Sequence, residues 1–184
     1  PGVLQIGAAF QVLAGQRSVS VAQALQHFEY PVLGWSRSAK TVVGVQCFSG
    51  TDGLDDFLAA TRILVCLLPL TPETDSILNR RHLTRLLPGA YVINVARGGH
   101  IVTDDLVWAL ENNIIGGAGL DVTEPEPLPD GHPLWSLNNC IITPHVGNTP
   151  AMAVPLLSER ITENVRHWAN GEDLIGPVFV DLGY

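Results

Sequence analysis

The sequence has little charge, few aromatic residues and almost no cysteine. Of its 184 residues, 15% are charged and 7% are aromatic, and only three are cysteines. Hydrophobic residues make up 46% of the chain, and its glycines form no repeat. This composition excludes a disordered chain, a coiled coil and a collagen, and favours a globular domain whose elements are buried on both sides.

Basic residues are also scarce. Ten Lys and Arg face 18 Asp and Glu, so the formal net charge is −8. Such a charge repels nucleic acid, and since no basic patch is evident we expect no nucleic-acid partner. The longest apolar run, 63–68, ends at Pro69. A membrane-spanning helix needs roughly 20 apolar residues, so no membrane span is expected, and residues 1–15 lack the pattern of a secretory signal.

The three cysteines, Cys47, Cys66 and Cys140, are an odd number without CxxC spacing. We expect buried thiols in a reducing cytoplasm, with neither a disulfide nor a metal site.

Apolar runs and helical periodicities alternate along the chain. This order predicts an α/β fold, doubly wound, with an open and mostly parallel sheet and helices on both faces. A turn is expected at 50–53, and Thr71 and Thr103 are expected to cap helices. Strands are expected at 30–35, 62–68, 91–95, 116–122 and 140–143, and helices at 21–28, 54–60, 71–87, from 103 onward and at 151–170.

Sheets of this type bind ligands at the carboxyl ends of their strands. We therefore expect the irregular segments that follow the strands to converge on one rim. These segments are 36–38, 68–71, 96–98, 121–126 and 144–145.

Two of these segments carry an acid and a base. His145 follows an expected strand and Pro144, while Glu124 and Glu126 follow another. A carboxylate bonded to an imidazole orients the ring and raises its pKa, as a general acid near neutral pH requires. His145 and Glu126 are thus a candidate acid/base pair, although a lone histidine is more often structural.

Arg97 follows the expected strand 91–95 and precedes Gly98 and Gly99, which let the backbone bend closely around a ligand. Its guanidinium can bind a carboxylate through two hydrogen bonds. An ordinary surface ion pair explains the residue equally well on spacing alone.

Ser36, Arg37 and Ser38 end the expected strand 30–35, where such sheets contact an adenosine ribose. An acid there would bind the 2′-hydroxyl, whereas an arginine accommodates a 2′-phosphate. The segment therefore favours NADP over NAD, with a solvated loop arginine as the alternative.

Four motifs together resemble the D-isomer specific 2-hydroxyacid dehydrogenases. They occur in the family's order and spacing and are Leu64-Val65-Cys66-Leu67-Leu68-Pro69-Leu70-Thr71, Asn94-Val95-Ala96-Arg97-Gly98, Leu120-Asp121-Val122 through Glu126-Pro127-Leu128, and Thr143-Pro144-His145. Within the family, Trp35 to Ser38, Pro133 to Trp135 and Asp181 to Tyr184 look most like the glyoxylate/hydroxypyruvate reductase branch. The resemblance covers roughly residues 19–184 and implies a Rossmann-like fold.

The resemblance also implies roles. Arg97 would hold the carboxylate and carbonyl of a 2-oxo acid, His145 would be the acid/base, and Glu126 its partner, since the family's glutamate stands five positions after the aspartate and precedes a proline. Asp121 would contact the nicotinamide carboxamide, and the chain would form a homodimer. Taken without the resemblance, Asp121 is a strand-end cap and several of the other contacts are core. The remaining cofactor contacts would be Gly15, Leu68, Pro69, Thr74, Val95, Ala96 and Gly147.

Two features depart from the family pattern. The glycines of the pyrophosphate turn should fall at 13, 15 and 18, where the sequence has Leu13, Gly15 and Ser18. Added β-carbons crowd the phosphates or tilt the following helix. The family's separate substrate lobe is also largely missing, so we expect a nucleotide-binding domain at 1–150, atypical over 1–18, and a helix and tail at 151–184 that return to that lobe.

The leading hypothesis is an NAD(P)H-dependent reductase of a small 2-oxo acid such as glyoxylate or hydroxypyruvate. The rival is a nucleotide-sensing or corepressor-like module that uses the same scaffold without catalysis. A fragment that binds nothing is the third possibility. Retention of Arg97, Glu126 and His145 together favours the first.

Overall fold

The computed structural model describes residues 6–9, 17–147 and 150–176. The chain divides into two compact units, Pro1–Pro144 and His145–Tyr184, and each is described by itself.

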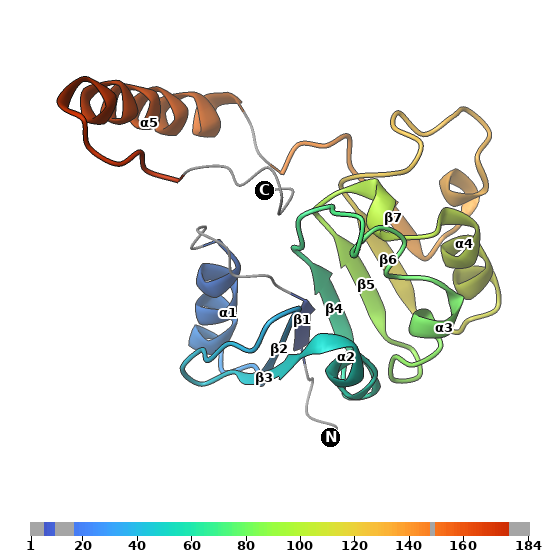
Figure 1. Ribbon diagram of the computed structural model, residues 1–184. Coiled ribbons are helices and arrows are strands. Elements are labelled where there is room, and N and C mark those ends of the chain that lie inside the picture. The colour runs from blue at the N-terminus through green and yellow to red at the C-terminus, as the bar shows by residue number, and fades with distance from the viewer. Residues whose placement is uncertain (1–5, 10–16, 148–149, 177–184) are drawn as a thin grey trace. The chain divides into compact units, whose positions relative to one another are not determined.

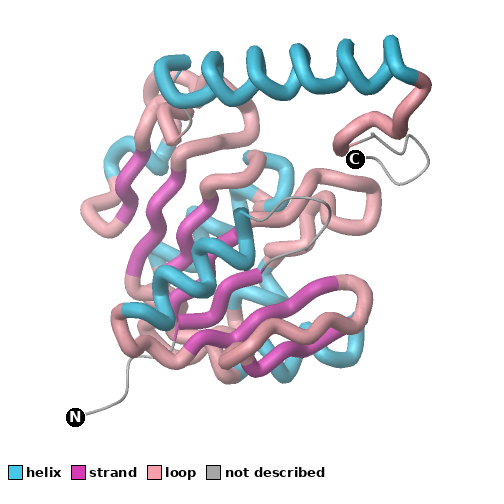
Figure 2. Tube along the Cα trace, turned by 90° about the vertical axis from the view of Figure 1, so that its left-hand side faces the viewer, coloured by secondary structure: helices cyan, strands magenta, loops and turns pink. Residues whose placement is uncertain are grey.

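The first unit is built on a seven-stranded sheet in which every neighbouring pair is parallel. The strand order is β3-β2-β1-β4-β5-β6-β7, so the chain moves outward from β1 and then crosses back to start the other half at β4. This reversal is the topological switch point of a doubly wound fold, and it confirms the expected fold class. Figure 2 shows the twist of the strands. Their bounds are β1 Ile6–Ala9, β2 Val32–Ser36, β3 Gln46–Ser49, β4 Ile63–Cys66, β5 Tyr91–Asn94, β6 Gly117–Leu120 and β7 Cys140–Ile142.

Helices lie on both faces of this sheet. The helix α1 (Arg17–His27) lies on one face, whereas α3 (Arg80–Leu83) and α4 (Thr103–Glu111) lie together on the other (Figure 1). Between β3 and β4, α2 (Gly50–Ala59) packs on β2 and β3. Right-handed crossovers require this arrangement, because the chain crosses the sheet in opposite directions in the two halves.

The main core lies between the sheet and the helices that follow β3. Phe57 of α2, Leu64 of β4 and Leu106 of α4 are almost fully buried in one contiguous cluster. The continuous apolar run around β4 predicts burial on both faces of the strand. In the structure, burial alternates along β4, because Leu64 is buried while Ile63 is only partly buried. Leu64 belongs to the larger cluster with Phe57 and Leu106, whereas Val65 packs against a smaller cluster that includes Ala22 of α1.

The long helix expected at 71–87 is wrong. Residues 72–76 form turns, and only Arg80–Leu83 is α-helical, capped by Asn79, whose side chain accepts a hydrogen bond from the His82 amide. The backbone between the two parts is used elsewhere, because the amides of Ser76 and Leu78 donate to the carbonyls of Gly99 and His100 at 2.8 Å. Tertiary pairing therefore outcompetes the local helical pattern.

Smaller corrections concern element ends. Thr103 is the first residue of α4 and not its cap, because its hydroxyl donates instead to the Glu124 carbonyl at 2.7 Å. The turn expected at 50–53 is the first turn of α2, and β3, a short edge strand, carries too weak an apolar pattern to be recognised.

In the described part of the second unit, residues 145–147 and 150–176, the helix is α5 (Pro150–Asn170), which ends at Gly171 with φ +70°. Leu157, Ile161 and Trp168 share its apolar stripe, and all three are exposed. Among the described residues, no helix is long and apolar enough to cross a membrane.

All three cysteines are free thiols. Cys66 is buried as expected, whereas Cys47 and Cys140 are only partly buried. Burial raises the pKa of Cys66 to about 12 and that of Cys140 to about 11. Both groups are therefore protonated at neutral pH. Across the ranges 6–9, 17–147 and 150–176, no group of three or more His, Cys, Asp and Glu side chains could hold a metal ion.

The core around β4 makes a stability prediction. Leu64→Ala removes a side chain that is 0% exposed, and we expect the free energy of unfolding to fall by about 2–5 kcal/mol because a cavity remains. Val43→Ala, at a side chain 90% exposed, should change it by about 0.5 kcal/mol or less. Urea unfolding followed by circular dichroism measures both, and equal losses would contradict the assignment of this core.

Candidate active site

The carboxyl ends of β2, β4, β5 and β6 lie on one edge of the first unit, because these strands are all parallel. Four of the segments predicted to converge, 36–38, 68–71, 96–98 and 121–126, leave the sheet at that edge.

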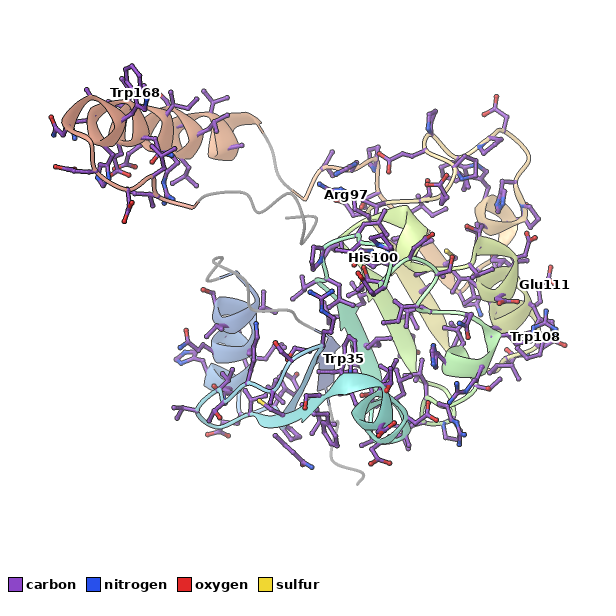
Figure 3. The ribbon with its side chains drawn as sticks, viewed as in Figure 1. Trp35, Arg97, His100, Trp108, Glu111 and Trp168 are labelled. Carbon is purple, nitrogen blue, oxygen red and sulfur yellow. The ribbon has the colours of Figure 1, made fainter. Side chains whose placement is uncertain are left out.

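Arg97 leaves this edge three residues after β5 ends and is exposed (Figure 3). Its guanidinium donates to the carbonyl of Ala96 at 2.6 Å. Its own carbonyl accepts from the side-chain amide of Asn94 at 2.8 Å and lies 2.9 Å from Nδ1 of His100. No described carboxylate forms an ion pair with Arg97, so the surface ion pair considered as an alternative is absent from this part of the chain.

The loop that carries Glu126 packs directly on the turn that follows Arg97. A β-carbon on Gly98 would overlap the carbonyl of Thr123 and lie 2.7 Å from the amide nitrogen of Glu124. The Thr103 hydroxyl holds the same loop through the Glu124 carbonyl. Two segments that are far apart in the sequence are thus brought together by a glycine that lacks a side chain, and Glu126, exposed, lies two residues further on.

Asp121 directly follows β6 and is 8% exposed. The Thr143 hydroxyl donates to its carboxylate at 2.5 Å, and its amide donates to the Asn94 carbonyl at 3.0 Å. These bonds join the ends of β5, β6 and β7. The role of strand-end cap, considered above as the alternative, is therefore present in the structure, and a nicotinamide contact stays a prediction.

His145 is the first residue of the second unit and follows Pro144. Its φ is +54°, in the left-handed region that residues with a β-carbon rarely adopt. His145 and Gly147 are both exposed. The meeting of His145 with Arg97 and Glu126 stays a prediction, because the two units are described separately.

The segment after β2 contacts the segment after β4. The guanidinium of Arg37 lies 3.3 Å from the Glu73 carboxylate. A hydrogen bond from Thr71, then the Glu73 backbone amide and the Arg37 charge, lower the pKa of Glu73. Ser36 is buried, and its hydroxyl donates to the Ser38 carbonyl at 2.8 Å. Ser36 therefore shapes this turn, while Arg37 and Ser38 are its more exposed side chains.

The other expected cofactor contacts fall into two groups. Leu68, Thr74 and Ala96 are buried, and the Thr74 hydroxyl holds its loop by donating to the Pro69 carbonyl at 2.6 Å. Val95 is exposed, and Pro69 partly so. Gly15 lies outside the described residues.

Several residues that hold the site were missed in the sequence. Asn94 and Thr103 could have been found, since a polar residue at the end of an apolar strand and a hydroxyl at a helix start are common anchors of loops. Glu73 and His100 give no such signal. The ion pair of Glu73 with Arg37 joins distant segments, and the burial of His100 arises only in the folded chain, although its contact with Arg97 spans three residues.

Known proteins are similar to this chain over most of its length. The family model described as "D-isomer specific 2-hydroxyacid dehydrogenase, NAD binding domain" matches residues 14–147. A curated relative, glyoxylate/hydroxypyruvate reductase A of Serratia proteamaculans (strain 568), is 44% identical over 172 residues. That alignment covers 93% of this chain but 54% of the relative, so the chain spans about half of the relative's length.

Solved structures agree. A D-isomer specific 2-hydroxyacid dehydrogenase from Xanthobacter autotrophicus Py2, crystallised with NADPH and MES, is 39% identical with a TM-score of 0.89, and the match covers all of this chain and 75% of that one. An NADPH-dependent glyoxylate/hydroxypyruvate reductase from Sinorhizobium meliloti, in complex with NADP and sulfate, is 32% identical with a TM-score of 0.90. The match covers 100% of this chain and 58% of that one.

The contact between the two loops can be tested at adjacent glycines. Gly98→Ala should lower the free energy of unfolding by about 1–3 kcal/mol, because its β-carbon meets backbone atoms that must shift. In Gly99→Ala the nearest atom is the flexible tip of Leu70 at 3.2 Å, so the expected loss is about 0.5 kcal/mol or less. Thermal unfolding compares the two variants, and similar losses would show that Gly98 is not the closer contact.

Proposed function

The chain belongs to the D-isomer specific 2-hydroxyacid dehydrogenase family through its NAD-binding domain, and from that premise we propose that the whole protein reduces a small 2-oxo acid such as glyoxylate or hydroxypyruvate. The glyoxylate/hydroxypyruvate reductase activity for which the Serratia and Sinorhizobium relatives are named supports this substrate class. The activity of these relatives does not favour the alternative of a nucleotide-sensing module.

The observation that carries the proposal is the state of Arg97. It stands at the ligand-binding edge of the sheet, is exposed, and has no described ion-pair partner, while its backbone is held by two side chains. A guanidinium in this state is available to bind the carboxylate of a 2-oxo acid through two hydrogen bonds. The same group stabilises negative charge that develops on the neighbouring carbonyl oxygen.

In the proposed reaction, protonated His145 donates its proton to that oxygen as the carbonyl becomes an alcohol. Glu126 would bond the other nitrogen of the imidazole and orient the ring for this transfer. The left-handed φ of His145 supports a functional role, since such conformations cluster at active sites. The bound nicotinamide supplies the hydride for the carbonyl carbon.

We propose NADP as the preferred cofactor, with Arg37 and Ser38 binding its 2′-phosphate. Arg37 fits this group, because it stands partly exposed at the end of β2 as the only cation in that turn of residues 36–38. Its partner Glu73 is a surface group that a phosphate can replace, since exposed ion pairs are weak. The NADPH and NADP bound by the Xanthobacter and Sinorhizobium proteins support this choice. Asp121 would contact the nicotinamide carboxamide.

We also propose that the protein works in the cytoplasm as a homodimer. Its three free cysteines suit a reducing compartment. The exposed apolar stripe on α5 supports association with another surface, because stripes of this kind are usually covered.

The substrate assignment is tested in the whole protein. Arg97→Ala should lower kcat/KM for glyoxylate or hydroxypyruvate by about 10²–10³-fold, because it removes the group that stabilises the developing charge. His145→Ala should lower it by about 10²–10⁴-fold through loss of the general acid. Arg81→Ala, a charge-matched control whose side chain pairs with Asp55 on the surface, should leave it unchanged. Near-native kinetics in either site variant would refute the assignment.

The cofactor assignment is tested by fluorescence titration with NADPH and NADH. Arg37→Ala should weaken NADPH binding by about 10- to 100-fold, the range of one charge-assisted hydrogen bond, and should leave NADH binding unchanged. Arg62→Ala, at a guanidinium bonded to the Pro88 carbonyl, is the matched control. An unaltered protein that binds NADH as tightly as NADPH would contradict the proposal.

A further inference from the structure

His100 is a histidine in a place where an apolar side chain would be expected. His100 is 0% exposed. It lies between Gly99 and Ile101, next to the β-bridge between Leu78 and Ile101. Among the described residues, its Nε2 is buried without a hydrogen-bond partner. A buried nitrogen without a hydrogen-bond partner is unfavourable. We therefore expect the other ring nitrogen to make an interaction that offsets this cost.

That other nitrogen, Nδ1, lies 2.9 Å from the carbonyl oxygen of Arg97. A carbonyl oxygen can only accept, so Nδ1 carries a proton and donates to this oxygen. The contact spans the 3₁₀ turn Gly98–His100 and adds to the backbone hydrogen bond from the His100 amide to the same oxygen at 3.3 Å. Figure 3 labels both residues.

Asn94 binds the same oxygen from the opposite end of the turn. Its amide nitrogen donates to the Arg97 carbonyl at 2.8 Å, and its amide oxygen accepts from the Ala96 backbone at 3.1 Å. Asn94 is 1% exposed at the end of β5 and is thus fixed by the sheet itself. The Arg97 carbonyl therefore has side-chain partners from the strand before it and from the turn after it.

We propose that His100 and Asn94 are positioning residues that fix the Arg97 peptide, so that the guanidinium points toward the substrate carboxylate. The proposal rests on the proposed function, in which Arg97 binds that carboxylate. A peptide free to rotate would carry the guanidinium away from the substrate, and a displacement of about 1 Å lowers rates on the order of 100-fold.

The experiment replaces His100 by three residues in the whole protein. His100→Asn places an amide donor near the position of Nδ1, whereas His100→Gln places it near Nε2, and His100→Leu fills the buried site with no donor. With the 2-oxo acid varied at saturating NADPH, His100→Leu should raise KM and lower kcat/KM on the order of 10- to 100-fold. His100→Asn should restore kcat/KM to within about threefold, and His100→Gln should not.

Two controls separate positioning from a merely structural role. NADPH affinity should be the same in all three variants, because the turn is not assigned to cofactor binding. Thermal unfolding of His100→Leu should occur at or above the temperature of the unaltered protein, since the unsatisfied nitrogen is gone. Loss of kcat/KM that follows loss of thermal stability across the three variants would overturn the proposal.

Nuclear magnetic resonance of the ¹⁵N-histidine-labelled protein tests the hydrogen bond independently of activity. The proposal requires the tautomer with the proton on Nδ1 of His100, and the tautomer with the proton on Nε2 overturns it. Failure of the proposed function is distinguishable. If the unaltered protein reduces no 2-oxo acid, both proposals fall, whereas an active protein with an unchanged His100→Leu variant overturns the positioning role alone.

Discussion

The parallel pairing of the strands is the constraint on which the site depends. Because β2, β4, β5 and β6 run in one direction, the segments after them leave the sheet on one edge. Arg37, Arg97 and the loop that carries Glu126 are placed there by the parallel strands that precede them. Pairing in a parallel sheet requires long crossovers, so residues that are more than fifty positions apart share this edge.

A second set of interactions fixes the backbone at that edge. Asn94, Asp121 and Thr74 are buried polar side chains at or after strand ends, and each is bonded to a neighbouring loop or strand. Burying such groups is favourable only when they are hydrogen-bonded, so each one selects a single loop conformation. The close packing of Gly98 against Thr123 also favours a single loop conformation, because a side chain at position 98 would overlap the Thr123 carbonyl. The loops that carry Arg97 and Glu126 are therefore held against the folded core of the first unit.

Much of this architecture could be read from local patterns. The apolar runs at β2, β4 and β5 predict strands, and the stripe through Leu157 and Ile161 predicts α5. The family follows from motifs that are short and fixed in spacing, and the family model confirms it. The helix expected at 71–87 was wrong because the amides of Ser76 and Leu78 bond to another segment, and a sequence window contains no trace of that partner.

The sequence by itself determined the fold class, the family and the residue types that can bind a carboxylate, move a proton or accept a phosphate. These follow from periodicity and side-chain chemistry, which are local properties. Only the tertiary structure decided that Arg97 has no described ion-pair partner, that Arg37 faces Glu73 and that a buried histidine holds the Arg97 carbonyl. The Arg37–Glu73 contact joins distant segments that meet only once the parallel sheet has brought the strand ends together. The burial of His100 also depends on the packing of the folded chain, although its bond to the Arg97 carbonyl spans only three residues.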